Sequence, residues 1–133
     1  MRWTLTTRYV VDAYAWIEYL DGTSRGAEVR DIIEEPRNQC TTSAVTLAEV
    51  VSKFTRKGRD PKPALRALED NSTLQAADTE LAILAGEIHA ELRKSVKDFG
   101  LADSFVLATA RNKGSKVLTG DPHFKTVAEA VMI

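Results

Sequence analysis

The stretch that decides the fold reads Tyr9-Val10-Val11-Asp12-Ala13-Tyr14-Ala15-Trp16-Ile17-Glu18-Tyr19-Leu20. Its apolar start predicts a strand over about residues 8–12, and its later apolar positions predict a helix that stops near Asp21-Gly22. An acid, Asp12, stands where the strand gives way to the helix. An ionised carboxylate beside a core is costly unless it is paired, hydrogen-bonded or bound to a metal. The junction is therefore a candidate site.

The rest of the chain continues this alternation of strands and helices. Further helices are predicted over about residues 24–34, 45–56, a short segment through Leu65 and Leu68 that Asp60 caps, a long segment through Leu81 and Leu92 that Asp78 caps, and 101–112. Further strands are predicted over about residues 40–43, 74–77, 116–119 and 131–133. This order favours a parallel sheet with helices on both faces. We expect one globular domain over residues 1–133, because 133 residues with 44% hydrophobic composition suffice for a core.

The helix predicted over residues 45–56 has an expected core face. Its apolar positions recur at helical spacing, and they are Leu47, Val50, Val51 and Phe54. Glu49 then points away from this stripe, so periodicity alone permits a plain exposed glutamate.

Composition excludes few functions. The net charge of −1 neither indicates nor excludes nucleic-acid binding. The single Cys40 cannot form an internal disulfide or a zinc site alone, and we expect it to be a small buried residue. The N-terminus lacks a signal-peptide segment, and no apolar stretch reaches membrane-spanning length. The expectation is a soluble protein of the reducing cytoplasm with no membrane partner.

Four acids stand in apolar settings, and they are Asp12, Glu49, Asp103 and Asp121. Each has an ordinary explanation alone: a solvated glutamate at 49, a charge at a helix N-terminus at 103, and turn or cap residues at 12 and 121. Together the four acids suggest a common explanation, which is binding of a divalent metal ion. Mg²⁺ and Mn²⁺ prefer carboxylate oxygen, and such a site can activate water and stabilise displacement at phosphorus. Carboxylates without His or Cys favour this chemistry over zinc hydrolysis.

With these acids in place, the chain resembles the PIN-domain family, especially the compact VapC-type toxins of prokaryotic toxin–antitoxin pairs. The matching stretches are the opening one from Val10 to Leu20, Thr42-Ser43-Ala44-Val45-Thr46-Leu47-Ala48-Glu49-Val50, Gly100-Leu101-Ala102-Asp103-Ser104-Phe105-Val106-Leu107-Ala108-Thr109-Ala110, and Val117-Leu118-Thr119-Gly120-Asp121-Pro122-His123-Phe124. They occur in family order and extend over essentially the whole chain. The motifs are short, and their combination is specific.

The resemblance implies a metal-dependent ribonuclease on a three-layer α/β/α sandwich, with a central parallel sheet of four or five strands. Position by position, Asp12, Glu49, Asp103 and Asp121 match the acidic quartet around Mg²⁺ or Mn²⁺. Thr119 matches a hydroxyl two residues before the last acid, which positions a ligand or water. The chain departs from the family at Tyr14, where a small polar residue is common.

The resemblance also implies partners. RNA would be the substrate, cut to leave a 5′-phosphate and a 3′-hydroxyl. A small antitoxin would cover the acidic pocket with its C-terminal segment, and helical faces would form a homodimer.

Basic residues gather near the predicted pocket, and they are Lys53, Arg56, Lys57, Arg59, Lys62 and Arg66. They form either a solvated surface or a patch that contacts phosphate. His123 lies close to Asp121, but we expect a surface or partner-contact residue there rather than a ligand. We expect Trp16 to pack in the core.

Other classes of function fit the sequence less well. A phosphatase of the haloacid-dehalogenase type needs a second acid where Tyr14 stands, and a response-regulator receiver needs paired early acids and a late lysine that have no clear match. Nucleotide-binding classes need a Walker loop or a Gly-x-Gly-x-x-Gly turn, and both are absent. Two alternatives stay open: a catalytically silent PIN-like interaction scaffold and a housekeeping RNA-processing nuclease.

Overall fold

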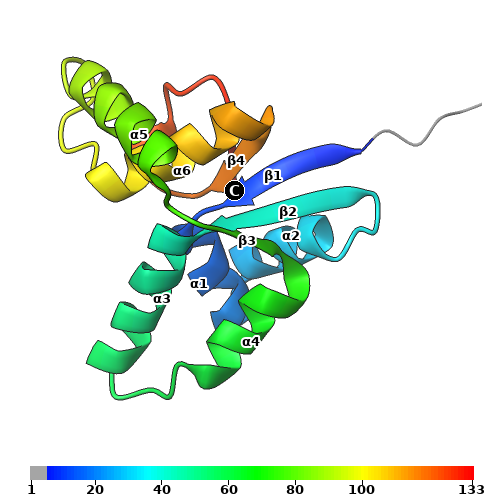
Figure 1. Ribbon diagram of the computed structural model, residues 1–133. Coiled ribbons are helices and arrows are strands. Elements are labelled where there is room, and N and C mark those ends of the chain that lie inside the picture. The colour runs from blue at the N-terminus through cyan, green and yellow to red at the C-terminus, as the bar shows by residue number, and fades with distance from the viewer. Residues whose placement is uncertain (1–5) are drawn as a thin grey trace, which may run out of the picture.

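A five-stranded parallel sheet forms the centre of the computed structural model, which describes residues 6–133 (Figure 1). Its strands are β1 (Thr7–Val11), β2 (Asn38–Ser43), β3 (Thr73–Gln75), β4 (Lys116–Thr119) and β5 (Ala130–Met132), in the order β3-β2-β1-β4-β5. The helices are α1 (Ala13–Asp21), α2 (Ser24–Ile33), α3 (Ala44–Arg56), α4 (Lys62–Asn71), α5 (Thr79–Leu92), α6 (Leu101–Lys113) and the 3₁₀ turn η1 (Pro122–Phe124). The first five residues, where no signal peptide is predicted, lie outside the described residues.

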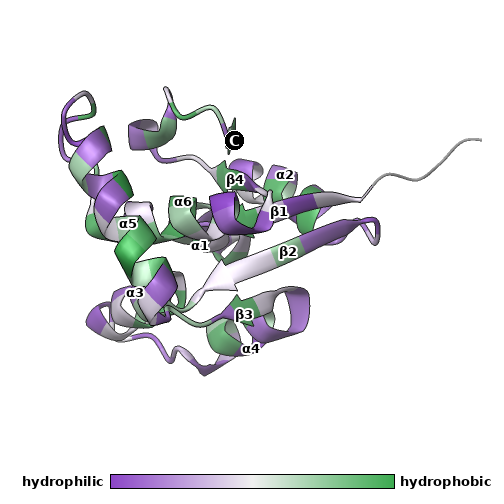
Figure 2. Cartoon of the chain, turned by 45° about the horizontal axis from the view of Figure 1, so that its top comes forward, coloured by the Kyte–Doolittle hydropathy of each residue, from purple (hydrophilic) through white to green (hydrophobic). Residues whose placement is uncertain are grey.

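Helices cover both faces of the sheet, as the alternation of side chains along β1 requires. Val10 belongs to a core cluster with residues of α5 and α6, and the adjacent Val11 belongs to a second cluster with residues of α1, α2, α3 and α4. Both side chains are fully buried. The three-layer α/β/α arrangement is therefore confirmed. In Figure 2, β1 and β2 begin with purple residues and become pale or green further along, and the helices around the sheet carry both purple and green residues.

The predicted order of elements is confirmed, with small shifts at their ends. β2 begins earlier than predicted, at Asn38, and β3 ends earlier, at Gln75. The predicted cap at Asp60 was wrong, because α4 begins at Lys62 and Pro61 holds the cap position. The Asp60 carboxylate still accepts a hydrogen bond from the Lys62 amide at 3.0 Å.

The predicted core face of α3 was also partly wrong. Its buried residues are Thr46, Val50 and Phe54, whereas Leu47 and Val51 are only half-buried. The predicted stripe is confirmed at Val50 and Phe54, and Leu47 packs against the same core cluster while remaining half-buried. Hydrophobicity alone did not predict that Thr46 is more buried than Leu47 or Val51.

The sheet topology brings three chain segments to one edge. β1 and β4 are parallel neighbours, with Val11 paired to Leu118, and β2 runs beside β1 in the same direction. Residues directly after these strands therefore meet at the carboxyl edge. The chain departs in opposite directions from β1 and β4, which is the place where open α/β sheets bind ligands.

Candidate active site

Asp12 occupies the point where β1 ends and α1 begins. It is the N-cap of α1, and its Oδ1 accepts a hydrogen bond from the Ala15 amide at 2.9 Å. Only 5% of the residue is exposed. The sequence places an acid here for two reasons at once, since aspartate caps helices well and the end of β1 opens onto the ligand edge.

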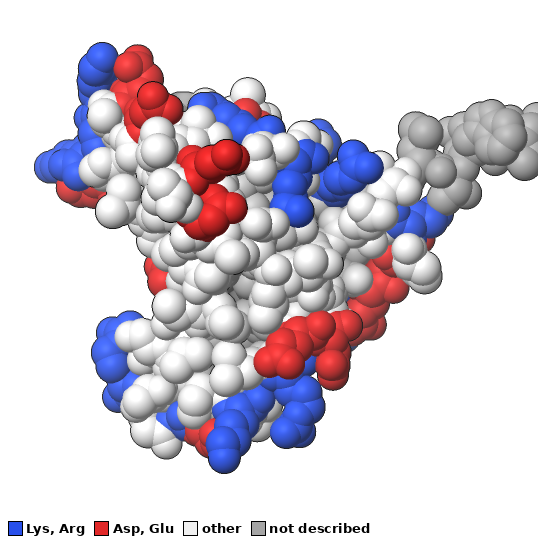
Figure 3. All heavy atoms as spheres, viewed as in Figure 1, with Lys and Arg blue, Asp and Glu red and all other residues white. Residues whose placement is uncertain are grey.

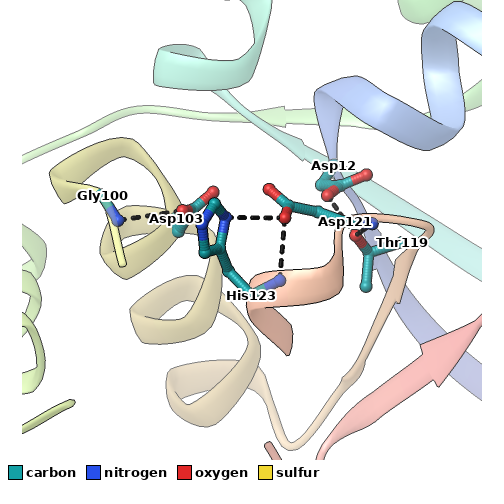
Figure 4. A network of polar contacts seen from close by, with 6 residues as sticks. All are labelled: Asp12, Gly100, Asp103, Thr119, Asp121 and His123. Atoms are coloured by element: carbon teal, nitrogen blue, oxygen red, sulfur yellow. Dashed lines mark hydrogen bonds and ion pairs between the residues drawn. The ribbon is translucent and has the colours of Figure 1, made fainter. Parts of the chain in front are cut away.

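Thr119, the last residue of β4, joins two of the acids. Its buried hydroxyl donates a hydrogen bond to Oδ2 of Asp12. The hydroxyl oxygen of Thr119 in turn accepts a hydrogen bond from the Asp121 amide at 2.9 Å. The threonine therefore fixes the orientation of the Asp12 carboxylate and the path of the chain into Asp121 (Figure 4).

Asp103 and Asp121 approach each other across the edge of the sheet. Asp103, in the first turn of α6, accepts a hydrogen bond from the Gly100 amide at 3.0 Å. Asp121 caps η1, and its Oδ1 accepts the His123 amide at 2.9 Å and lies 2.8 Å from His123 Nδ1. One ligand atom from each of these three side chains fits within 4.8 Å of the others. Figure 4 shows the Asp121 carboxylate between Asp12 and the Asp103–His123 pair.

Glu49 completes the group from a third direction, on α3. Together with Asp12, Asp103 and Asp121 it lines a single cavity of about 730 Å³. The structure thus brings the four acids to one site, because Glu49 lies off the buried stripe of α3, as predicted, and lines this cavity. Its side chain stays accessible to water at the mouth of the site.

Crowding and burial favour the protonated acids. Burial is the main cause that raises the pKa of Asp12 to about 7, against the lowering effect of its bonds from Thr119 and Ala15. The pKa of Glu49 also rises to about 7, through partial loss of hydration and then through the charges of Asp103 and Asp121. Burial raises the pKa of Asp103 as well. In all three cases burial is the largest cause of the raised pKa, and the charge of at least one neighbouring carboxylate adds to it.

The donor set fits a hard divalent cation. Four carboxylates face one cavity, and within residues 6–133 none of them forms an ion pair with Lys or Arg. A bound cation would favour the ionised form of Asp12, Glu49 and Asp103, whose pKa values are raised by burial and by neighbouring carboxylates. Oxygen ligands of this kind suit Mg²⁺ or Mn²⁺.

Sequence similarity identifies the family to which this fold belongs. The PIN domain model matches residues 9–130, and the chain belongs to the PIN-domain family. No curated protein shows significant sequence similarity to the chain.

Solved structures agree on the fold. VapBC2 from Rickettsia felis, bound to a promoter DNA fragment, is similar with a TM-score of 0.73 at 14% identity, over 96% of this chain and 98% of that one. VapC20 from Mycobacterium tuberculosis, described as a sarcin–ricin loop cleaving toxin, gives 0.73 at 18% identity, over 94% and 98%. DNA-bound VapBC from Salmonella typhimurium gives 0.70 at 20% identity, over 96% and 97%.

The structure also tests the expectations for His123, Trp16 and Cys40. His123, which the sequence placed outside the ligand set, contacts Asp121 directly. The sequence signal for this contact was the position of His123 two residues after Asp121, the residue that caps η1. Trp16 is fully buried, as expected, and donates a hydrogen bond to Thr42. Cys40 is buried, which raises the pKa of its thiol to about 11.

Within residues 6–133, no helix is long and apolar enough to cross a membrane.

Proposed function

We propose that this protein is a metal-dependent endoribonuclease and the toxin of a type II toxin–antitoxin pair. The observation that carries the proposal is the convergence of Asp12, Glu49, Asp103 and Asp121 on one cavity at the carboxyl edge of the sheet. Membership of the PIN-domain family and the likeness in fold to VapC toxins support it.

Each acid has a proposed role. Asp12, Asp103 and Asp121 would hold Mg²⁺ or Mn²⁺, and Glu49 would bind it directly or through water. The bound ion would supply an activated water and charge stabilisation for in-line hydrolysis, which leaves a 5′-phosphate and a 3′-hydroxyl. Thr119 would not bind the ion itself. Its hydroxyl holds the Asp12 carboxylate in a fixed orientation, and Asp12 would bind the ion.

The chain offers a matched pair of variants to test the chemistry. Asp12→Asn and Asp78→Asn each remove one carboxylate from a helix N-cap, and each carboxylate accepts an amide at 2.9 Å. Asn is an equally good cap, so both variants should fold. We expect Asp12→Asn to lower RNA cleavage about a hundredfold or more and Asp78→Asn to leave it unchanged.

Two outcomes of that experiment would contradict the proposal. Equal cleavage by both variants, in preparations free of contaminating nuclease, would remove Asp12 from the mechanism. No cleavage of any RNA by the wild-type chain with Mg²⁺ or Mn²⁺ would favour the silent scaffold.

A toxin requires an inhibitor, and the site suggests how one would act. We propose that a small antitoxin covers the acidic cavity with its C-terminal segment and places a basic side chain among the carboxylates. Expression of the wild-type chain alone should arrest growth, and Asp12→Asn should be harmless. Harmless expression of active wild-type protein would favour a housekeeping nuclease.

A homodimer is also proposed. The outward side of α3 carries a shallow, mainly apolar hollow of about 500 Å³ that includes Leu47, Ala48 and Val51. Apolar helical faces of this kind are suited to packing against a second copy. Light scattering of the isolated protein should give the mass of a dimer, and a monomer at all concentrations would contradict it.

A further inference from the structure

The acidic cavity continues as a groove between two helices. Residues of α1 form one wall, and they are Tyr14, Ile17, Glu18 and Asp21. Residues of α3 form the other wall, and they are Val45, Ala48, Glu49, Ser52, Lys53 and Arg56. Both sets recur at spacings of three and four, so each is one continuous stripe along its helix.

The α3 wall changes sign along its length. Glu49 belongs to the acidic quartet, and Lys53 and Arg56 follow it at positions four and seven residues further on. These spacings place Arg56 about 10 Å from Glu49 along the helix axis. Neither cation forms an ion pair within the described part of the chain. The Arg56 Nε atom only donates to Ser52 Oγ, at 3.3 Å on the same wall.

The acids of the α1 wall are already engaged. The Thr23 hydroxyl donates to the Glu18 carboxylate at 2.6 Å. Asp21 pairs with Arg59 at 3.1 Å, and the Arg59 guanidinium lies 4.1 Å above the centre of the Phe54 ring. Within the described residues, the charges that have no oppositely charged partner at this end of the groove are those of Lys53, Arg56 and Glu18, so two cations face one carboxylate and the net charge is positive.

The Asp21–Arg59 pair also limits the groove. Asp21 is the last residue of α1, and Arg59 follows the end of α3, so the pair connects the two walls beyond Arg56. The groove thus runs from the acidic quartet to this pair. A length of about 10 Å is enough for about two phosphates beyond the one at the acids.

We infer that this groove holds the single-stranded RNA next to the cleavage site, with Lys53 and Arg56 binding the backbone phosphates that follow the scissile one. The inference rests on the proposed function. Two helices that pack together leave a channel for one strand, whose bases contact the Tyr14 ring and the Ile17 side chain. Lys53 and Arg56, four and seven residues after Glu49, position the RNA strand without entering the acidic site.

The other basic residues of this region provide the control. Lys62 and Arg66 lie on α4, are exposed and do not line the cavity. Figure 3 shows Lys and Arg side chains in blue over the lower end of the molecule, where α3 and α4 meet. A diffuse basic surface would use all of these cations alike. A defined groove would use only the two that line it.

The test measures RNA binding in an Asp12→Asn background, which prevents cleavage. Lys53→Gln/Arg56→Gln is compared with Lys62→Gln/Arg66→Gln, since both remove two charges and keep long side chains. A labelled single-stranded RNA of mixed sequence is titrated by fluorescence anisotropy at several salt concentrations and fixed Mg²⁺. For the groove variant we expect about tenfold weaker binding or more, and a salt slope reduced by about 1.4. The control should match the parent.

The remaining outcomes separate the groove from the function. If both double variants lose the same affinity, or neither loses any while the wild-type chain cleaves RNA through Asp12, the groove assignment fails and the nuclease stands. If a duplex of the same length competes as well as the single strand, the assignment also fails. If the wild-type chain neither binds nor cleaves RNA, both proposals fail.

Discussion

Two contacts hold the Tyr14 side chain, one at its hydroxyl and one at its ring. Its hydroxyl accepts a hydrogen bond from Arg25 Nη1 at 2.7 Å. A Cβ added to Gly120 would lie 2.3 Å from the Tyr14 ring, so the ring packs directly on that backbone. Gly120 separates Thr119 from Asp121. The residue that departs from the family pattern therefore supports the turn that carries two site residues.

This packing makes Gly120→Ala costly. The new methyl group must displace the Tyr14 ring or the turn, and such overpacking typically costs about 1–3 kcal/mol. We expect Tyr14→Ala to recover most of this loss in the double variant, measured as the free energy of unfolding in urea. Gly86→Ala is the control, because nothing lies within 4 Å of its added Cβ, and alanine in α5 should stabilise the fold. Additive effects of the two changes would contradict the contact.

Asp12 should make the metal-free protein less stable as the pH rises. Its pKa is raised from 3.8 to about 7 in the fold. Below about pH 4 the carboxyl is protonated whether the chain is folded or not, and between about pH 4 and 7 the unfolded chain ionises while the folded one keeps its proton. The loss is on the order of 4 kcal/mol at most. Asp12→Asn should therefore gain stability over the wild type across this range in the presence of a chelator. Parallel stability–pH curves for the two proteins would contradict this.

At the scale of elements, α3 shows where sequence-based prediction reached its limit. Strand order and helix positions follow from apolar runs and turn residues, and these were predicted. The buried face of α3 is set by its neighbours in the fold, and there Thr46 is buried while the more apolar Leu47 is only half-buried. Periodicity placed Glu49 off the core face but could not show that this side of α3 borders the cavity, so the fourth acid could be proposed from the family resemblance but not from periodicity.

Two adjacent valines test which side of α3 faces the core. Val50 is fully buried, and Val51 is half-buried at the outward hollow. Val50→Ala should cost about 2 kcal/mol of unfolding free energy, and Val51→Ala clearly less. Chemical denaturation at low protein concentration keeps any dimer from contributing. Equal losses would mean that the periodic stripe predicted from the sequence faces the core after all.

At the scale of the molecule, a bound cation should stabilise the entire fold. Mg²⁺ or Mn²⁺ that binds only the folded chain adds about 2.7 kcal/mol at a hundredfold excess over its Kd. Because binding must displace protons from Asp12 and Glu49, the apparent affinity should rise with pH up to about 7. Thermal melts with metal, and again after a chelator is added, measure both effects.

Two variants give that experiment its controls. The metal-induced shift should be small in Asp12→Asn and intact in Asp78→Asn, which lies outside the cavity. Equal shifts in both would place the cation elsewhere on the molecule.

The two outer strands of the sheet, β3 and β5, have three residues each. An extended peptide that joined either border would find few free backbone donors and acceptors to pair with. Short borders of this kind also give other chains little template for β-aggregation. A partner gains little here by strand addition, the mode in which main-chain hydrogen bonds provide affinity. The proposed antitoxin must therefore be recognised by its side chains, and its sequence at the acidic cavity should tolerate little change.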